Sequence, residues 1–246
     1  MPGFEIIDKK EKKAVDKIFQ EGGILFAHGF DKVRKNKKGG GLLTAADEDI
    51  DPVLIETESE DTEIMTIQVK AGNQNIRIIN AYGPQEDDES KDILNFWQEM
   101  ETEVLKAKDN DCMVMIEMDA NAKVGKDVIK DDPNKMTGNG KLLMDMLKRQ
   151  NLTILNSLDI CSGTITRERK VENKIEKSVI DYIVVCENML NYILEVSVDD
   201  ARTDVLARYI KTKDSIKVVQ SDHNILFSKF KIAFRRKLSK IRKEIF

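Results

Sequence analysis

Alternating apolar and polar positions between residues 63 and 84 predict a β-hairpin. The segment EIMTIQVK at 63–70 alternates with a period of two, the AGNQ turn follows, and NIRIINAYGP at 75–84 continues as a second strand that Pro84 ends. Residues 88–108 then place apolar side chains at helical spacing, and acidic residues crowd the first turns, where the helix dipole favours them. The pattern therefore predicts two paired strands followed by a long helix.

The rest of the chain mixes further strands with helices. A buried strand at 112–118 ends in a polar loop, the segment at 138–150 has the pattern of a helix, and 163–177 is a polar excursion. Another helix is predicted at 203–212. Further strands are predicted at 152–157, 178–185, 214–219 and 224–234. Hairpins that alternate with two clear helices predict a layered α/β fold with a mixed sheet.

The first forty residues are harder to interpret. A lysine-rich stretch at 9–20 has the composition of a short helix, 22–30 is an apolar strand or loop, and 37–45 is a glycine-rich turn that enters a strand. We expect the region before Gly39 to be the least well packed part of the fold.

Charges are segregated along the chain, although the net charge is only −4. Acidic residues concentrate at 47–63, while basic residues concentrate at 31–41 and in the tail at 229–246. Segregated charge can form a phosphate-binding face on an acidic protein, and the alternative is that these runs are solvated loops and a frayed end. Net charge therefore does not decide whether nucleic acid is a partner.

Cys112, Cys161 and Cys186 are an odd set without CxxC or Cys/His spacing, which predicts reduced thiols and no zinc site. No apolar run approaches the length of a membrane span, and the N-terminus lacks the apolar core of a signal peptide. We therefore expect no membrane partner and an intracellular location, nuclear or cytoplasmic. The sequence does not indicate an oligomeric state.

Acidic and amide side chains accompany three of the apolar strands. Asp119 and Asn121 come after MVMIEM, Asp181 lies within SVIDYIVV, and Asp222 and His223 precede NILFSKF. A carboxylate inside an apolar strand is costly to bury without a partner, so Asp181 predicts a nearby cation or histidine. We expect these five side chains to converge at one edge of the sheet.

Four segments resemble the endonuclease/exonuclease/phosphatase family in their order along the chain. They read NAYGP, MDANAKVG, SVIDYIVV and SDHNIL where the family has, roughly, N-x-Y-x-P, G-D-F-N, S-x-I-D-Y and S-D-H. More narrowly, they are similar to the apurinic-endonuclease-like domain of LINE-type (non-LTR) retrotransposon polyproteins. In those polyproteins a basic linker joins this domain to a reverse transcriptase. The resemblance implies a DNase I-like layered α/β sandwich with mixed, mostly antiparallel sheets, lacking some N-terminal strands. It covers 39–234, between a poorly matching segment at 1–38 and a basic tail at 235–246.

By this resemblance the chain is an Mg²⁺-dependent endonuclease domain that nicks DNA, with Mn²⁺ as an alternative metal. Asp119 would orient or deprotonate the attacking water, and Asn121 would hold that water or the phosphate. His223 would contact the scissile phosphate, with Asp181 hydrogen-bonded behind it to fix the tautomer. The alternative for Asn121 is a residue that favours the turn after the strand.

The resemblance also implies a metal site and a further phosphate contact. Asp222 and Glu21 would bind Mg²⁺, a hard cation that prefers oxygen ligands, and Tyr82 would donate its hydroxyl to a phosphate oxygen. The alternatives are a solvated helix end for Glu21 and a ring that packs at the hairpin end for Tyr82. His28, in FAHGF, has no such context and is interpreted as a loop or partly buried histidine.

Three departures from the family pattern bear on activity. No convincing version of the family's first strand precedes MPGFEII. The KIFQEGG segment that contains Glu21 is a poor match for the family's metal-binding strand, because the stretch before it is lysine-rich and helical in pattern. Met118 and Ala120 replace a glycine and a bulky residue, so we expect the methionine to crowd the site. The segment at 166–178 is more charged than the family's substrate loop.

These departures leave three hypotheses: a weakened endonuclease, an inactive remnant that binds nucleic acid, and a small-substrate phosphatase of the superfamily.

Overall fold

The computed structural model describes residues 23–29, 41–47, 50–57, 62–204, 207–211 and 216–232. The helix predicted at 9–20, the candidate metal ligand Glu21 and the basic tail at 235–246 lie outside the described residues. The interpretations of those segments therefore stay predictions, as does the loose packing expected before Gly39.

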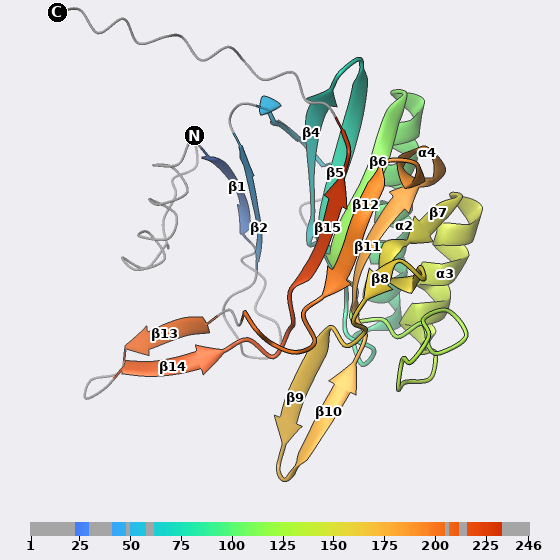
Figure 1. The fold of residues 1–246 in the computed structure, drawn as a ribbon. Coiled ribbons are helices and arrows are strands. Elements are labelled where there is room, and N and C mark those ends of the chain that lie inside the picture. The colour runs from blue at the N-terminus through green and yellow to red at the C-terminus, as the bar shows by residue number, and fades with distance from the viewer. Residues whose placement is uncertain are drawn as a thin grey trace, which may run out of the picture.

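A six-stranded sheet forms the centre of the fold (Figure 1). Its order is β3-β4-β5-β6-β11-β7, in which β5 and β6 run parallel and the other neighbours run antiparallel. The predicted hairpin at 63–84 is confirmed as β4 and β5. The strands span Val53–Ile55 (β3), Ile64–Ala71 (β4), Gln74–Tyr82 (β5), Cys112–Asp119 (β6), Asp181–Cys186 (β11) and Leu152–Ile154 (β7).

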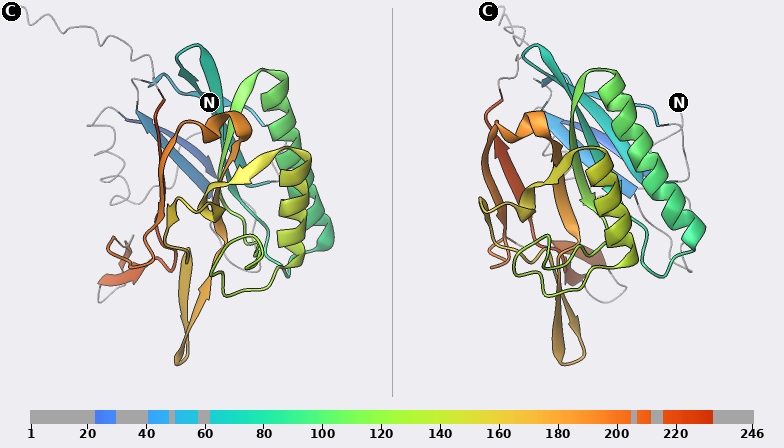
Figure 2. Two further views of the ribbon diagram at one scale, coloured as in Figure 1. Left: turned by 45° about the vertical axis from the view of Figure 1, so that its right-hand side comes forward. Right: turned by 90° about the vertical axis from the view of Figure 1, so that its right-hand side faces the viewer.

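Two helices, α2 (Ser90–Asp109) and α3 (Gly138–Arg149), cover one face of this sheet (Figure 2). Both were predicted from their apolar stripes, which are buried against the sheet. Trp97 of α2 donates from Nε1 to Oδ1 of Asn139 in α3 at 3.1 Å, so the two helices are also joined to each other. Neither these two nor any other helix among the described residues has the length and apolarity to span a bilayer.

A smaller three-stranded sheet packs on the opposite face of the central sheet. In it, β12 (Ile193–Val198) lies between β15 (Leu226–Phe230) and β8 (Cys161–Ser162). Figure 2 shows helices, central sheet and second sheet as successive layers. The fold is therefore a layered α/β sandwich with mixed, mostly antiparallel sheets, as predicted. The core between the two sheets includes Met113, Met115, Val185 and Val196.

Two-stranded ribbons and two short helices make up the other elements given for the described residues. The ribbons are β1 (Gly23–Gly29) with β2 (Gly41–Asp47), β9 (Arg167–Val171) with β10 (Lys174–Ser178), and β13 (Ala207–Lys211) with β14 (Ile216–Gln220). The short helices are the 3₁₀ turn Leu155–Ser157 and α4 (Glu187–Leu190). The β9–β10 and β13–β14 hairpins project beyond the sandwich (Figure 1).

The helix predicted at 203–212 is wrong, and the description of 163–177 as a polar excursion was incomplete. The strand predicted at 152–157 ends at Ile154, where a 3₁₀ turn follows, and strand β12 was not predicted. The segment at 203–212 contains strand β13, which pairs antiparallel with β14. The polar excursion at 163–177 contains the β9–β10 hairpin, in which Lys177 and Glu168 form an ion pair at 2.9 Å across the strands. Pairing across strands fixes the extended backbone of both the β13 and the β9–β10 segments, and local periodicity does not show such pairing.

Candidate functional site

Strand register places three of the predicted site residues side by side. Tyr82 at the end of β5 pairs with Asp119 at the end of β6, and Asp119 pairs with Asp181 at the start of β11. Side chains in one such row project from the same face of a sheet, here the face away from α2 and α3. Met118 projects to the helix side and is buried there in the core. The methionine expected to crowd the site therefore points away from Asp119.

The segment between β14 and β15 brings His223 to this row. The backbone N–H of Asn224 donates to the carbonyl oxygen of Thr166 at 2.7 Å. The Thr166 hydroxyl oxygen in turn accepts from the backbone N–H groups of Ile180 at 3.0 Å and Asp181 at 3.1 Å. Because Thr166 is fully buried, it fixes the His223 loop and the start of β11 relative to each other.

Sequence reasoning missed Thr166, Asn224 and the neighbouring Arg167. Each acts on residues that are distant in the sequence, so no local periodicity marks it. The one available signal is the uncharged pair Ile165-Thr166, which stands directly before a run of charged residues. In the structure, this pair supplies Thr166, which is buried at the base of the charged β9–β10 hairpin.

His223 and Asp181 form a hydrogen-bonded pair. Nδ1 of His223 lies 3.0 Å from Oδ1 and 3.1 Å from Oδ2 of Asp181. An ionised carboxylate only accepts, so Nδ1 carries the hydrogen. This bond raises the pKa of His223 above its ordinary value; burial opposes the rise, and the charges of Asp181, Asp119 and Asp222 add to it. The half-buried carboxylate of Asp181 thus has the histidine partner that its place in an apolar strand predicted.

Asp119 lies beside this pair. Its Oδ2 is 3.8 Å from Nε2 of His223, and its Oδ1 accepts from the backbone N–H of Asn121 at 3.1 Å. Burial and the charge of Asp181 raise the pKa of Asp119 to about 7, against the opposing effects of His223, Asn121 and Arg167. A carboxyl group with a pKa near neutrality can accept and release a proton at an ordinary working pH.

Asp222 is held by an arginine at the base of the β9–β10 hairpin. Nε of Arg167 donates to Oδ2 of Asp222 at 2.9 Å, and Oδ1 of Asp222 is 3.9 Å from Nε2 of His223. Burial alone would raise the pKa of Asp222, but Arg167 and His223 outweigh it, and the pKa falls below its ordinary value. Asp222 is therefore ionised at neutral pH and already has a cationic partner.

Asn121 and Tyr82 both make contacts within the protein. Nδ2 of Asn121 donates to the carbonyl oxygen of Gly83 at 2.9 Å, and the Asn121 backbone is left-handed, with φ at 46°. The Tyr82 hydroxyl accepts from Nε2 of Gln85 at 3.2 Å. These contacts fit the turn and hairpin-end alternatives, so the roles in phosphate binding stay proposals. His28, expected in a loop or partly buried, lies in β1 opposite Leu42.

The cluster can supply ligands for a metal ion. Asp119, Asp181 and His223 each offer one ligand atom, and these atoms all lie within 4.8 Å of one another. Carboxylate oxygens suit hard divalent cations, and a neutral imidazole nitrogen is an additional ligand. Because Nδ1 of His223 is bonded to Asp181, Nε2 is the ring nitrogen left for a metal or a phosphate. The donor set therefore fits a divalent metal.

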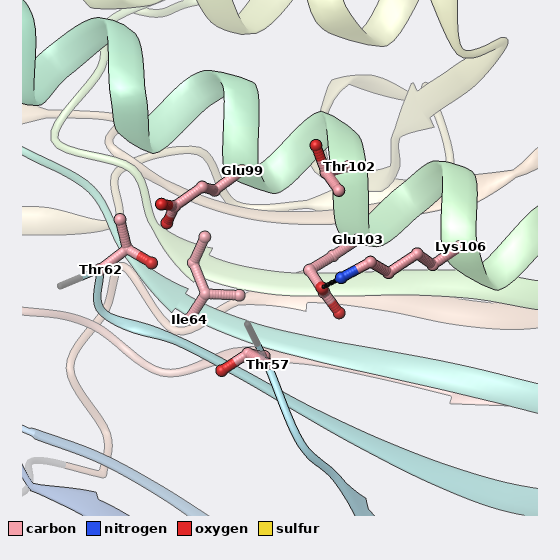
Figure 3. A pocket seen from close by; sticks show the side chains of 7 residues that line it. All are labelled: Thr57, Thr62, Ile64, Glu99, Thr102, Glu103 and Lys106. Atoms are coloured by element: carbon pink, nitrogen blue, oxygen red, sulfur yellow. Dashed lines mark hydrogen bonds and ion pairs between the residues drawn. The ribbon is translucent and has the colours of Figure 1, made fainter. Parts of the chain in front are cut away.

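A cavity of about 230 Å³ lies away from this cluster, between α2 and the start of β4 (Figure 3). Its charged side chains are Glu99, Glu103 and Lys106, and Lys106 is already paired with Glu103 at 3.0 Å. The lining is therefore net negative and unsuited to a phosphate. The cavity also lies on the helix side of the sheet, whereas Asp119 projects from the opposite side.

The pKa of Asp119 predicts a loss of stability as pH rises. Its folded-state pKa of about 7 exceeds the ordinary value of 3.8, so the folded protein binds this proton more tightly than the unfolded chain does. The resulting stabilisation is complete below pH 4 and disappears as pH rises through 7, a change on the order of a few kcal/mol. Urea unfolding in chelator at pH 5 and pH 8 measures it.

The variant Asp119→Asn separates the stability change due to Asp119 from that due to His223. The pKa of His223 is also raised, so its contribution to stability is likewise lost as pH rises. The variant removes the titrating group, so its free energy of unfolding should fall less than that of the wild type between pH 5 and pH 8. Equal falls in the two proteins would contradict the prediction.

No protein-family model and no curated protein matches the chain. Among solved structures, the endonuclease domain of TRAS1, a telomere-specific non-LTR retrotransposon, has a TM-score of 0.62 at 18% identity, over 89% of this chain and 90% of that chain. A 3′-5′ exonuclease from Neisseria meningitidis has a TM-score of 0.60 at 14% identity, over 87% of this chain and 82% of that chain. An endonuclease/exonuclease/phosphatase family protein from Bacteroides thetaiotaomicron has a TM-score of 0.57 at 12% identity, over 90% of this chain and 76% of that chain. The shared property at these identities is the DNase I-like fold.

Proposed function

We propose that this chain, which has the fold of the endonuclease/exonuclease/phosphatase proteins, is a divalent-metal-dependent phosphodiesterase that nicks DNA. The His223–Asp181 pair beside Asp119 carries the proposal. It combines an imidazole, whose raised pKa favours the protonated form that suits a phosphate, with a carboxyl group whose pKa of about 7 suits proton transfer. Phosphodiester hydrolysis needs both functions, since water must be activated and the phosphate charge offset.

Asp119 orients the attacking water and accepts its proton. The water oxygen bonds to phosphorus while the bond from phosphorus to the leaving oxygen breaks. His223 donates from Nε2 to a phosphate oxygen and offsets the negative charge that grows in the transition state. Asp181 fixes the imidazole through Nδ1 and raises its pKa, so it is a positioning residue.

Asn121 and Tyr82 add hydrogen bonds to the water or to the phosphate, as in the family motif. Asp222 and Glu21 are the proposed Mg²⁺ ligands, and the carboxylate of Asp119 is a further candidate ligand. Mn²⁺ is the alternative metal. When bound, the metal neutralises phosphate charge and polarises the phosphorus–oxygen bond.

DNA is the proposed substrate because proteins with similar folds act on it. The Neisseria 3′ phosphatase NExo has been solved bound to a product DNA hairpin, and the TRAS1 domain is an endonuclease of a retrotransposon. The order of the motifs in this chain supports an origin in a LINE-like element, in which the tail at 235–246 would lead toward a reverse transcriptase.

Conversion of supercoiled plasmid to nicked circles tests the proposal. The wild-type protein should nick with Mg²⁺ and stop when the metal is chelated. Because Asp222 must exchange Arg167 for the metal, nicking should need more Mg²⁺ than an endonuclease with a free carboxylate needs. Nicking that persists undiminished in chelator would contradict metal dependence.

Binding without hydrolysis is the second candidate. It is favoured by the Arg167–Asp222 ion pair, which occupies a carboxylate that the metal would need. A protein of this kind would retard DNA in a salt-sensitive manner and leave plasmid intact at every Mg²⁺ concentration.

A further inference from the structure

The guanidinium group of Arg167 stands inside the candidate site. We propose that Arg167 is a built-in cation of this site, which holds Asp222 when no metal is bound and binds a phosphate oxygen of the substrate. This inference rests on the proposed function, because it assigns a phosphate-binding residue to the same site.

The hydrogen bonding of Arg167 leaves most of its donors available. Its Nε–H donates to Oδ2 of Asp222 at 2.9 Å, and no other acceptor for its side chain is found among the described residues. An arginine carries five N–H donors in a rigid fork that matches phosphate oxygens. The four N–H groups on the terminal nitrogens therefore remain for an anion. The side chain is 27% exposed, so a ligand can reach it.

The backbone holds Arg167 next to the phosphate-binding histidine. Arg167 and His223 form an antiparallel β-bridge, and the backbone N–H of Glu168 donates to the carbonyl oxygen of Asp222 at 2.7 Å. Thr166, the preceding residue, is buried and bonded to the start of β11. The base of the hairpin is thus rigidly joined to the site. Its position is therefore set by the fold, even though the hairpin tip projects away.

A metal ion and Arg167 compete for the same carboxylate. Oδ2 of Asp222 accepts from Nε, and a hard cation bound to that oxygen would displace the guanidinium. Removal of Arg167 should therefore strengthen metal binding and weaken phosphate binding. Loss of structure would weaken both, so the two opposite changes separate a role in the site from a role in folding.

Binding of Mn²⁺ and of DNA to Arg167→Met tests the inference. Calorimetry with Mn²⁺ alone should show affinity increased by about two- to fivefold, as expected for release of a partly exposed ion pair. Fluorescence anisotropy with a short oligothymidylate in chelator, at fixed ionic strength, should show affinity reduced by about the same factor.

Arg169→Met is the matched control, because Arg169 is an exposed arginine two residues along the same strand. It should leave Mn²⁺ affinity unchanged and reduce oligothymidylate affinity by less than about twofold. Equal losses of DNA affinity in the two variants would assign the effect to general charge and overturn the inference. Unchanged Mn²⁺ affinity in Arg167→Met, or a fall in both affinities, would also overturn it.

Arg167→Lys keeps the test valid if the methionine variant fails to fold. Lysine retains the charge but lacks the planar fork, so oligothymidylate affinity should fall while the protein melts as the wild type does. Wild-type affinity in a folded lysine variant would overturn the inference in that case. These measurements need no turnover, so a wild-type protein that never nicks would refute the proposed function and leave this result standing.

Discussion

Replacing His223 with alanine should reduce the rate of DNA nicking by at least about a hundredfold, the usual effect of removing a donor that stabilises transition-state charge. The substitution removes the imidazole that Asp181 holds at 3.0 Å and whose pKa that bond raises. Initial rates of plasmid nicking at saturating Mg²⁺ measure the change. The loss should appear in turnover and hardly in DNA affinity, because many other phosphate contacts contribute to binding.

Asp127→Asn is the control for charge and handling, since Asp127 is exposed and lies outside the site. It should nick at the wild-type rate. Asp181→Asn should have an intermediate rate, because the imidazole remains but loses the carboxylate that fixes its orientation. A folded His223→Ala protein that nicks as fast as the wild type would remove His223 from the proposed mechanism.

Replacing Gly83 with alanine should destabilise the protein by about 3 kcal/mol, which corresponds to roughly 10 °C in melting temperature for a chain of this length. A Cβ at Gly83 would overlap the backbone carbonyl of Ala120. The backbone of Gly83 cannot withdraw freely, because its N–H donates to the carbonyl oxygen of Asp119 at 2.7 Å and its carbonyl accepts from Asn121. The clash should therefore also displace the loop that carries the site.

Gly138→Ala provides the matched comparison. A Cβ at Gly138 would meet the carboxylate of Glu86, which accepts from the backbone N–H groups of Gly138 and Asn139 but belongs to a side chain that can shift more easily than the backbone can. Alanine is also a better helix former than glycine in the first turn of α3. Thermal melting should show little change for this variant. Equal melting temperatures for the two alanine variants would show that the contact between Gly83 and Ala120 is not constrained.

Local periodicity predicted several elements that bury one face, although it missed β12 of the second sheet. Strands β4 and β5 alternate with period two, and α2 and α3 have apolar stripes at helical spacing, so each was found within a few residues of its bounds. The same method failed at β13, because this ribbon does not belong to either packed sheet and its strand is fixed by pairing with β14.

The candidate site shows a similar division. The positions of polar residues at the ends of predicted strands indicated that Asp119, Asp181 and His223 belong together. Asp119 and Asp181 are in register on β6 and β11 of the central sheet, whereas His223 reaches them from the segment between β14 and β15, which are not in that sheet. Arg167 and Thr166 could not be found in this way. Both lie in a charged segment with no local pattern, and their partners Asp222 and Asp181 are distant in sequence.

The sequence alone therefore determined the layered α/β architecture and the residues around which a site is built, since both depend on short-range patterns of apolar and polar side chains. The tertiary structure decided how those residues are paired. Register across β5, β6 and β11 aligned Tyr82, Asp119 and Asp181, and the hairpin base placed Arg167 on Asp222. Charges act through space and hydrogen bonds act over about 3 Å, so the pKa values and partners of these groups depend on distances that no linear pattern contains.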